Sequence, residues 1–86
     1  MIKFLLGESR PLEFEITHQD GLEFIINKAT YSVYKGNELI ETGDMDIHDH
    51  IVSHVFTPQD RGYYLFELSY TIGPTTRVAR YHINVD

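Results

Sequence analysis

The sequence of 86 residues contains no cysteine and no tryptophan. Without cysteine the chain forms no disulfide and has no thiol nucleophile, and it is suited to folding in a reducing compartment. Without tryptophan it lacks the broad ring on which carbohydrate-binding sandwiches commonly stack sugars. Disulfide-stabilised secreted folds and cysteine chemistry are therefore excluded.

Basic residues are also scarce. The chain has 7 Lys and Arg against 13 Asp and Glu, which gives a net charge of −6. Six of the acids lie in the segment from Glu38 to Asp60, which contains no Lys or Arg. Such a segment repels phosphate, whereas a nucleic-acid binder of this size usually has a basic stripe. No nucleic-acid partner is expected.

Long apolar runs are absent as well. The apolar stretch after Met1 ends at Gly7, which is too short for a secretory signal, and no later segment could span a bilayer. We expect a complete cytoplasmic gene product from Met1 to Asp86, with no membrane partner. A chain of this length makes one domain, residues 1–86, large enough to bury a modest hydrophobic core.

The pattern that the sequence does contain is a period-two alternation of apolar and polar residues. It is clearest in residues 12–17, 64–72 and 79–85. Glycine and proline separate the runs, and a turn is expected at residues 18–21. No helical periodicity of useful length is present. The pattern predicts an all-β protein, an immunoglobulin-like antiparallel β-sandwich of about seven strands.

The stretch Asp60-Arg61-Gly62-Tyr63-Tyr64 carries the most informative fold signal. In immunoglobulin-like sandwiches, a tyrosine near the start of the penultimate strand donates its hydroxyl hydrogen bond to the backbone just upstream. The spacing predicts such a corner, with Asp60 and Gly62 at the turn and Tyr64 as its tyrosine.

The alternation also predicts which side chains form the core. The expected core residues are Phe14, Ile16, Tyr31, Val33, Phe56, Tyr64, Phe66, Leu68, Tyr81 and Ile83. For residues 51–56 two registers stay open, because both faces carry apolar residues. Either Val52, His54 and Phe56 face inward, or Ile51, Ser53 and Val55 do.

Three histidines form the sharpest chemical cluster. On one extended strand His48, His50 and His54 would point the same way, and imidazole is a preferred zinc ligand, with Asp44 or Asp46 available to complete a set. The span from His48 to His54 is about 20 Å on such a strand, so only His48 and His50 are kept, as weak metal candidates. Imidazoles beside carboxylates could also sense pH near neutrality. The ordinary explanation is a solvated polar surface, and no metal is expected.

No catalytic constellation is found in the sequence. Glu13 and Glu15 share the solvent face of one strand, without the cleft that acid–base catalysis requires. No serine lies in a nucleophile elbow, and no glycine loop resembles a phosphate cradle. We expect no enzyme activity, no cofactor and no small-molecule ligand. Tyr34 and Tyr63 are expected to face outward, where tyrosine packs across strands, stacks on sugars or anchors protein contacts.

The first strand, residues 2–6, is expected to be an open sheet edge. An unprotected edge invites pairing with another chain, and only Lys3 protects this one. The last strand, residues 78–85, is better guarded by charged and polar side chains. Lys3, Phe4 and Leu6 are therefore the expected interaction edge, through which the chain would bind a partner or copies of itself.

Several segments together resemble a known family. They are residues 12–17 with Asp20-Gly21; Ala29-x-Tyr31-x-Val33-Tyr34-x-x-Gly36 with Ile40 and Gly43; and Phe56-Thr57-Pro58-x-Asp60-x-Gly62-x-Tyr64 with Phe66-Glu67 and Tyr81-x-Ile83-x-Val85. The arrangement is similar to the small immunoglobulin-like modules of tailed bacteriophages and prophages, notably the N-terminal module of baseplate upper proteins. The resemblance covers nearly the whole chain.

The resemblance implies a virion structural protein, synthesised in the cytoplasm of the host bacterium and docked on the tail, the baseplate or the capsid. Its partners would be other virion proteins and copies of itself. Baseplate upper proteins continue into a second region that holds receptor-binding subunits, and this sequence has no counterpart to it. The expected role is that of a small structural or decorating subunit.

Two other functions stay open. One is a host-surface or carbohydrate-binding adhesion module. The other is an immunoglobulin-like cysteine protease inhibitor of the chagasin kind, whose Asn-Pro-Thr-Thr-Gly type of loop has a faint counterpart in Gly73-Pro74-Thr75-Thr76-Arg77.

Overall fold

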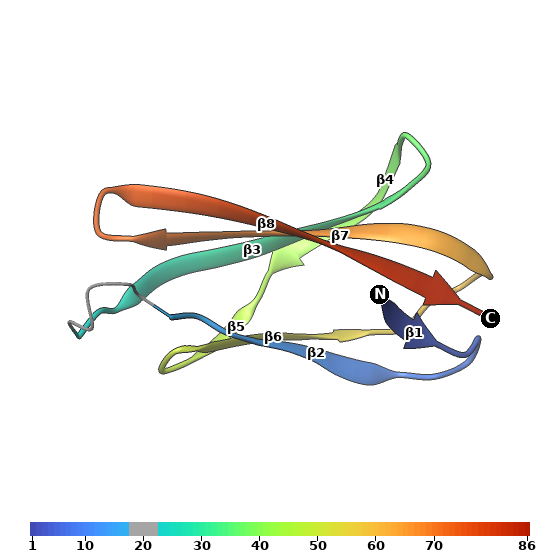
Figure 1. The fold of residues 1–86 in the computed structure, drawn as a ribbon, viewed down its shortest axis with the longest axis horizontal. Helices are drawn as coiled ribbons and strands as arrows, with labels where there is room; N and C mark the ends of the chain where they lie inside the picture. The colour runs from blue at the N-terminus through green and yellow to red at the C-terminus, as the bar shows by residue number, and fades with distance from the viewer. Residues whose placement is uncertain (18–22) are drawn as a thin grey trace.

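The computed structural model describes residues 1–17 and 23–86, and this part of the chain folds into eight strands in two facing sheets (Figure 1). The strands are β1 (Ile2–Phe4), β2 (Arg10–Glu15), β3 (Ile26–Lys35), β4 (Glu38–Asp44), β5 (Asp46–His48), β6 (Ile51–Phe56), β7 (Gly62–Ile72) and β8 (Thr75–Val85). The turn expected at residues 18–21 lies outside the described residues. Within those residues there is no helix of the length and apolarity needed to cross a membrane.

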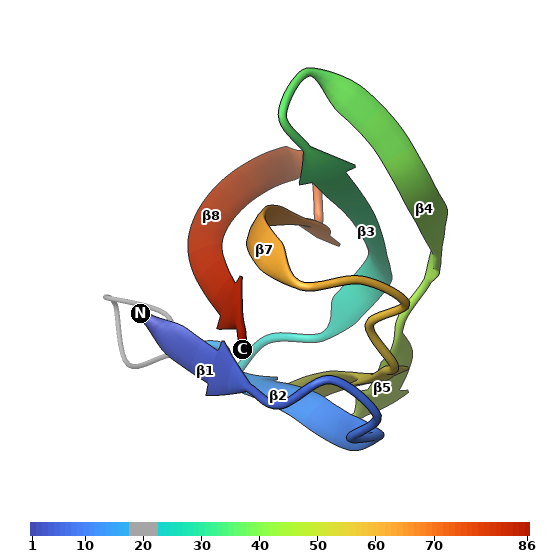
Figure 2. The same cartoon turned by 90° about the vertical axis from the view of Figure 1, so that its right-hand side faces the viewer.

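The larger sheet has the strand order β1-β8-β7-β3-β4, and the smaller sheet has the order β2-β6-β5. Figures 1 and 2 show β4 and β5 passing from one layer to the other, and Met45 between them is buried. Every described strand pair is antiparallel except one, because β1 runs parallel to the end of β8. The chain is an immunoglobulin-like β-sandwich, as the sequence predicts, with one parallel pair that the period-two pattern does not reveal.

The core lies between the two sheets and is built from alternate residues of the strands. Its buried side chains are Phe4, Leu12, Ile16, Ile26, Ala29, Tyr31, Val33, Met45, Val52, Phe56, Tyr64, Phe66, Leu68, Ile83 and Val85. All ten predicted core residues belong to it or, for Phe14 and Tyr81, pack against it while partly buried. The alternation therefore identified the inner face of the main strands correctly.

β6 takes the first of the two registers that the sequence leaves open. Val52 and Phe56 are buried, whereas Ile51 and Val55 are exposed. The Phe56 ring meets the edges of Phe4 and Tyr64, with centroids 5.4 and 5.9 Å apart. A phenylalanine buries more apolar surface than a valine, so this register stabilises the sandwich more than the alternative would.

The first strand is shorter than expected, and its last side chain, the aromatic ring of Phe4, points inward. Phe4 is only 2% exposed, and the Arg10 guanidinium covers its ring at 4.1 Å from the centroid. The expected place of Phe4 on an interaction edge is therefore wrong, because β1 contributes this side chain to the core. Leu6 lies beyond the strand, where its amide donates a hydrogen bond to the Asp86 carbonyl oxygen at 2.8 Å. Of the three expected edge residues, Lys3 is the one that lies exposed within β1.

The tyrosine corner forms at the start of β7. The Tyr64 hydroxyl donates to the Asp60 carbonyl oxygen at 2.7 Å. Gly62 has a φ of 129°, a backbone conformation that residues with a Cβ rarely adopt. Lys35 supports the corner from β3, because its ammonium group donates to the Arg61 carbonyl oxygen at 3.0 Å. Asp60, Gly62 and Tyr64 thus fix the entry of the chain into β7.

Phe66→Ala should lower the free energy of unfolding by about 3 to 5 kcal/mol, most of the stability of a domain of this size. The side chain is fully buried and stacks between Tyr31 and Phe14, with both centroid distances 5.7 Å. Urea denaturation measures the loss. Phe14→Ala, at the partly buried neighbour of Phe66 in the same stack, should cost less. A larger loss for Phe14 would contradict the assigned centre of the core.

Tyr64→Phe should lower the free energy of unfolding by about 1 to 3 kcal/mol, because the Asp60 carbonyl loses its partner. Tyr63→Phe is the matched control, since Tyr63 is exposed and should change stability by less than about 0.5 kcal/mol. Equal stabilities of the two variants would show that the corner bond contributes nothing.

Candidate functional site

The three histidines of the expected cluster lie in three different places. His48 ends β5, His50 lies in the following turn and His54 lies inside β6. The chain folds back at Asp49, whose φ is 58°, so the imidazoles do not share the face of one extended strand. Residues 1–17 and 23–86 contain no group of three His, Asp or Glu side chains that could hold a metal ion.

His54 belongs to a hydrogen-bonded cluster that joins the two sheets. Its Nε2 donates to Glu41 Oε2 of β4 at 2.8 Å, and the Tyr31 hydroxyl of β3 donates to the same oxygen at 2.8 Å. The imidazole also stacks on the Tyr31 ring, with centroids 3.8 Å apart. One carboxylate therefore connects β3, β4 and β6.

The position of Glu41 depends on a β-bulge. The register between β3 and β4 shifts by one residue after Val33, so that Glu41 pairs with Val33 and faces the interior. Without the shift Ile40 would take that place and Glu41 would point to solvent. Instead Ile40 is exposed and Glu41 reaches Tyr31. The sequence carries no recognisable signal for this bulge, which is why sequence reasoning missed the cluster.

The environment of Tyr31 disfavours its phenolate. Burial, the hydrogen bond to Glu41 and the negative charge of that carboxylate raise the pKa of Tyr31 to about 12. The phenol is therefore protonated at neutral pH and donates a hydrogen bond. We interpret the cluster of Tyr31, Glu41 and His54 as a polar link that holds the edge strand β4 against the smaller sheet.

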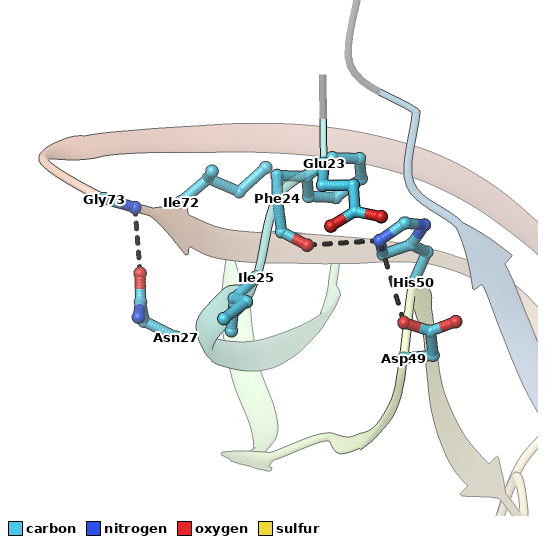
Figure 3. Close-up of a pocket in the computed structure, with 8 residues that line it drawn as sticks. All are labelled: Glu23, Phe24, Ile25, Asn27, Asp49, His50, Ile72 and Gly73. Carbon is cyan, nitrogen blue, oxygen red and sulfur yellow. Dashed lines mark hydrogen bonds and ion pairs between the residues drawn. The ribbon is translucent and has the colours of Figure 1, made fainter. Parts of the chain in front are cut away.

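An open groove of about 730 Å³ lies at the end of the sandwich that carries the β7–β8 turn (Figure 3). It is lined by Glu23, Phe24, Ile25, Asn27, Asp49, His50, Ile72 and Gly73. The His50 ring stacks on Phe24 with centroids 4.0 Å apart, and its Nε2 donates to the Phe24 carbonyl oxygen at 3.1 Å. An aromatic stack beside carboxylates is chemistry that could bind hydroxyl groups or a cation.

The outer face of the larger sheet carries a row of apolar side chains. Leu39 pairs with Tyr34, and Tyr34 pairs with Leu65 across three neighbouring strands. Tyr63 precedes Leu65 on the same face of β7. Leu39 is 50% exposed and Tyr63 is 69% exposed, while Tyr34 and Leu65 between them are half-buried. We call these four residues the Tyr63 row.

Comparison with known proteins gives a likeness of fold. No family model and no curated protein matches the chain. A solved structure of an engineered protein superposes on 99% of the chain with a TM-score of 0.80 at 10% identity. A structure of a proposed glycoside hydrolase from Bacteroides vulgatus superposes on 100% of the chain with a TM-score of 0.61 at 18% identity. The present chain spans 18% and 17% of those two chains, and such low identities establish the sandwich architecture alone.

Glu41→Gln should lower the pKa of Tyr31 from about 12 toward its ordinary value of 10.0, because the variant loses the negative charge. The shift should be partial, since burial is the largest cause. Absorbance titration of phenolate measures the change, and Tyr31→Phe identifies which of the six tyrosines gives the signal.

The same raised pKa predicts how stability depends on pH. The folded chain keeps the Tyr31 proton where an unfolded tyrosine loses it, so the free energy of unfolding should fall as pH rises from 10 to 12. Tyr31→Phe should show a smaller fall. If the free energy of unfolding falls equally in the wild-type protein and in Tyr31→Phe between pH 10 and 12, the stated environment of Tyr31 is ruled out.

Proposed function

We propose that this chain is a non-enzymatic structural subunit of a bacteriophage particle. Its immunoglobulin-like module would dock on the tail, the baseplate or the capsid through protein–protein contacts. The bacteriophage assignment rests on the resemblance of residues 12–17, 29–43 and 56–85 to modules of tailed phages. The observation that carries the docking role is the Tyr63 row.

The Tyr63 row differs from the rest of its sheet face. The next row, across β3, β7 and β8, is polar. Ser32 pairs with Glu67, and Glu67 pairs with Arg80, with which it also forms an ion pair at 2.9 Å. A solvent-facing sheet surface is normally of this second kind. Tyrosine is enriched among protein-binding hot spots, and the exposed Leu39 at the other end of the row adds apolar surface to such a contact. The row therefore supports a protein partner.

The groove near His50 favours one second candidate, a carbohydrate-binding adhesion module. Its Phe24–His50 stack could receive a sugar face, and Glu23 and Asp49 could accept hydrogen bonds from hydroxyl groups. One solved neighbour is described as a proposed glycoside hydrolase, but only 17% of that chain is covered. The inhibitor alternative is weaker, because Thr75 and Thr76 pair with β7 in a tight hairpin and form no projecting loop.

Quantitative mass spectrometry of particles purified from the host that carries the gene tests the proposal. We expect the chain in stoichiometric copies: many per particle for a capsid or tail-tube position, few for the baseplate. Tyr63→Ser combined with Leu39→Ser should keep the melting temperature and lower incorporation. Val55→Ser, exposed on the other sheet, is the matched control and should incorporate normally.

Absence of the chain from particles would refute the virion assignment. Glycan-array binding that is lost in His50→Ala would then support the adhesion module instead. Normal incorporation of the Tyr63 and Leu39 double variant would leave a virion protein whose docking surface is not the Tyr63 row.

A further inference from the structure

β8 is paired along only part of one side. Along one hydrogen-bonding edge β8 pairs with β7 over its whole length, eleven residues in unbroken register. Along its other hydrogen-bonding edge β8 pairs only with β1, through Ile83, Asn84 and Val85. Figures 1 and 2 both show β1 beside the C-terminal end of β8 alone. Among the described residues, no strand pairs with residues 75–82 on that side, and we call this segment the β8 edge.

The direction of the backbone groups along the β8 edge follows from the pairing of its end. The Asp86 amide donates to the Phe4 carbonyl oxygen at 3.0 Å, and the Leu6 amide donates to the Asp86 carbonyl oxygen at 2.8 Å. Asp86 thus directs both backbone groups outward. Backbone N–H and C=O groups of successive strand residues point to opposite edges of the strand. Those of the even-numbered β8 residues therefore point away from β7. Along the β8 edge these are Thr76, Val78, Arg80 and His82.

The other sheet edges carry features that prevent pairing. β4 has the bulge after Val33 and three acidic side chains, and β2 has Pro11 and two glutamates on its outer face. β1 and β5 are three residues long. The β8 edge has no proline, glycine, acid or register shift. Its charged and polar side chains, which the sequence suggested as guards, include Arg77, Arg80 and His82. Among the described residues, this edge is therefore protected by side-chain polarity alone, with no feature of the backbone that prevents pairing.

We propose that two copies of this chain pair antiparallel through their β8 edges, around a two-fold axis at Ala79. The outward positions 76, 78, 80 and 82 are symmetric about residue 79, so Thr76 would face His82 and Val78 would face Arg80 of the second copy. In this register every outward amide and carbonyl finds a partner. Four residues in each copy, with two groups each, would form eight hydrogen bonds.

The side chains favour the same register. With the axis at Arg80 two guanidinium groups would face each other, which destabilises a strand pair. With the axis at Ala79, Arg77 faces Tyr81 of the second copy at the closer, non-hydrogen-bonded positions, where a cation–π contact can form. Val78, which is 50% exposed, packs against the aliphatic part of Arg80. No like charges lie opposite one another.

This pairing does not rest on the virion assignment, because it uses a sheet edge and leaves the Tyr63 row uncovered. It would hold equally for an adhesion module. The failure of either proposal leaves the other intact, since one concerns particles and the other concerns the purified chain.

Single-cysteine crosslinking tests the register, and the absence of native cysteine makes it free of background. In Ala79→Cys the two Cα atoms would lie about 4.5 Å apart, within the range that a disulfide spans. Mild oxidation should give a covalent dimer on a non-reducing gel. Val55→Cys, exposed on the other sheet, is the control for random collision and should react much more slowly.

Charge substitution at Val78 gives a second test, in which opposite charges should shift the dimer dissociation constant in opposite directions. Val78→Lys puts a lysine opposite Arg80 twice in each dimer and should raise the dimer dissociation constant by about tenfold, whereas Val78→Glu should lower it. Analytical ultracentrifugation over a wide concentration range measures both. Circular dichroism checks that each variant keeps the fold.

Several results would overturn the proposal. They are a wild-type chain that stays monomeric up to millimolar concentration, equal effects of Val78→Lys and Val78→Glu, or Ala79→Cys reacting no faster than Val55→Cys. Faster crosslinking of Lys3→Cys would assign the contact to β1 and would overturn it as well.

Discussion

The stack of aromatic rings around Phe66 is the interaction on which the rest of the structure depends. Phe66 of β7 lies between Tyr31 of β3 and Phe14 of β2, and the stack continues to His54 on one side and Tyr81 on the other. Its members come from both sheets, since His54 and Phe14 belong to the smaller sheet and the other three rings to the larger one. Interiors are close-packed, so the stack fixes the spacing of the layers and the register of the strands that supply it.

The fold was predictable because it depends on two local signals, the period-two alternation and the tyrosine corner. Both report on neighbouring residues, and both are present in β7. The parallel pairing of β1 with β8 is different, because it joins the two ends of the chain and leaves no local pattern. For that reason the sequence placed Phe4 on an edge, whereas the structure buries it against Phe56.

The polar cluster was not predictable, since it depends on an irregularity. A one-residue bulge between β3 and β4 turns Glu41 inward, where it accepts hydrogen bonds from Tyr31 and His54. Gly43 contributes too, because a Cβ there would lie 3.2 Å from Cε1 of Tyr31. The expectation that three imidazoles share one strand face was wrong for a related reason. The turn at Asp49 separates histidines that a continuous strand would have aligned.

The two proposed surfaces are geometrically compatible, which gives the dimer a consequence for docking. Strands that pair edge to edge around a two-fold axis keep equivalent faces on the same side of the joined sheet. Two larger sheets of five strands each would therefore present both Tyr63 rows toward one surface. Two linked sites bind a repeated surface more tightly than one, because the second contact forms within an already bound complex. Under the two proposals together, a dimer would hold the module on a regular array more tightly than a single Tyr63 row could.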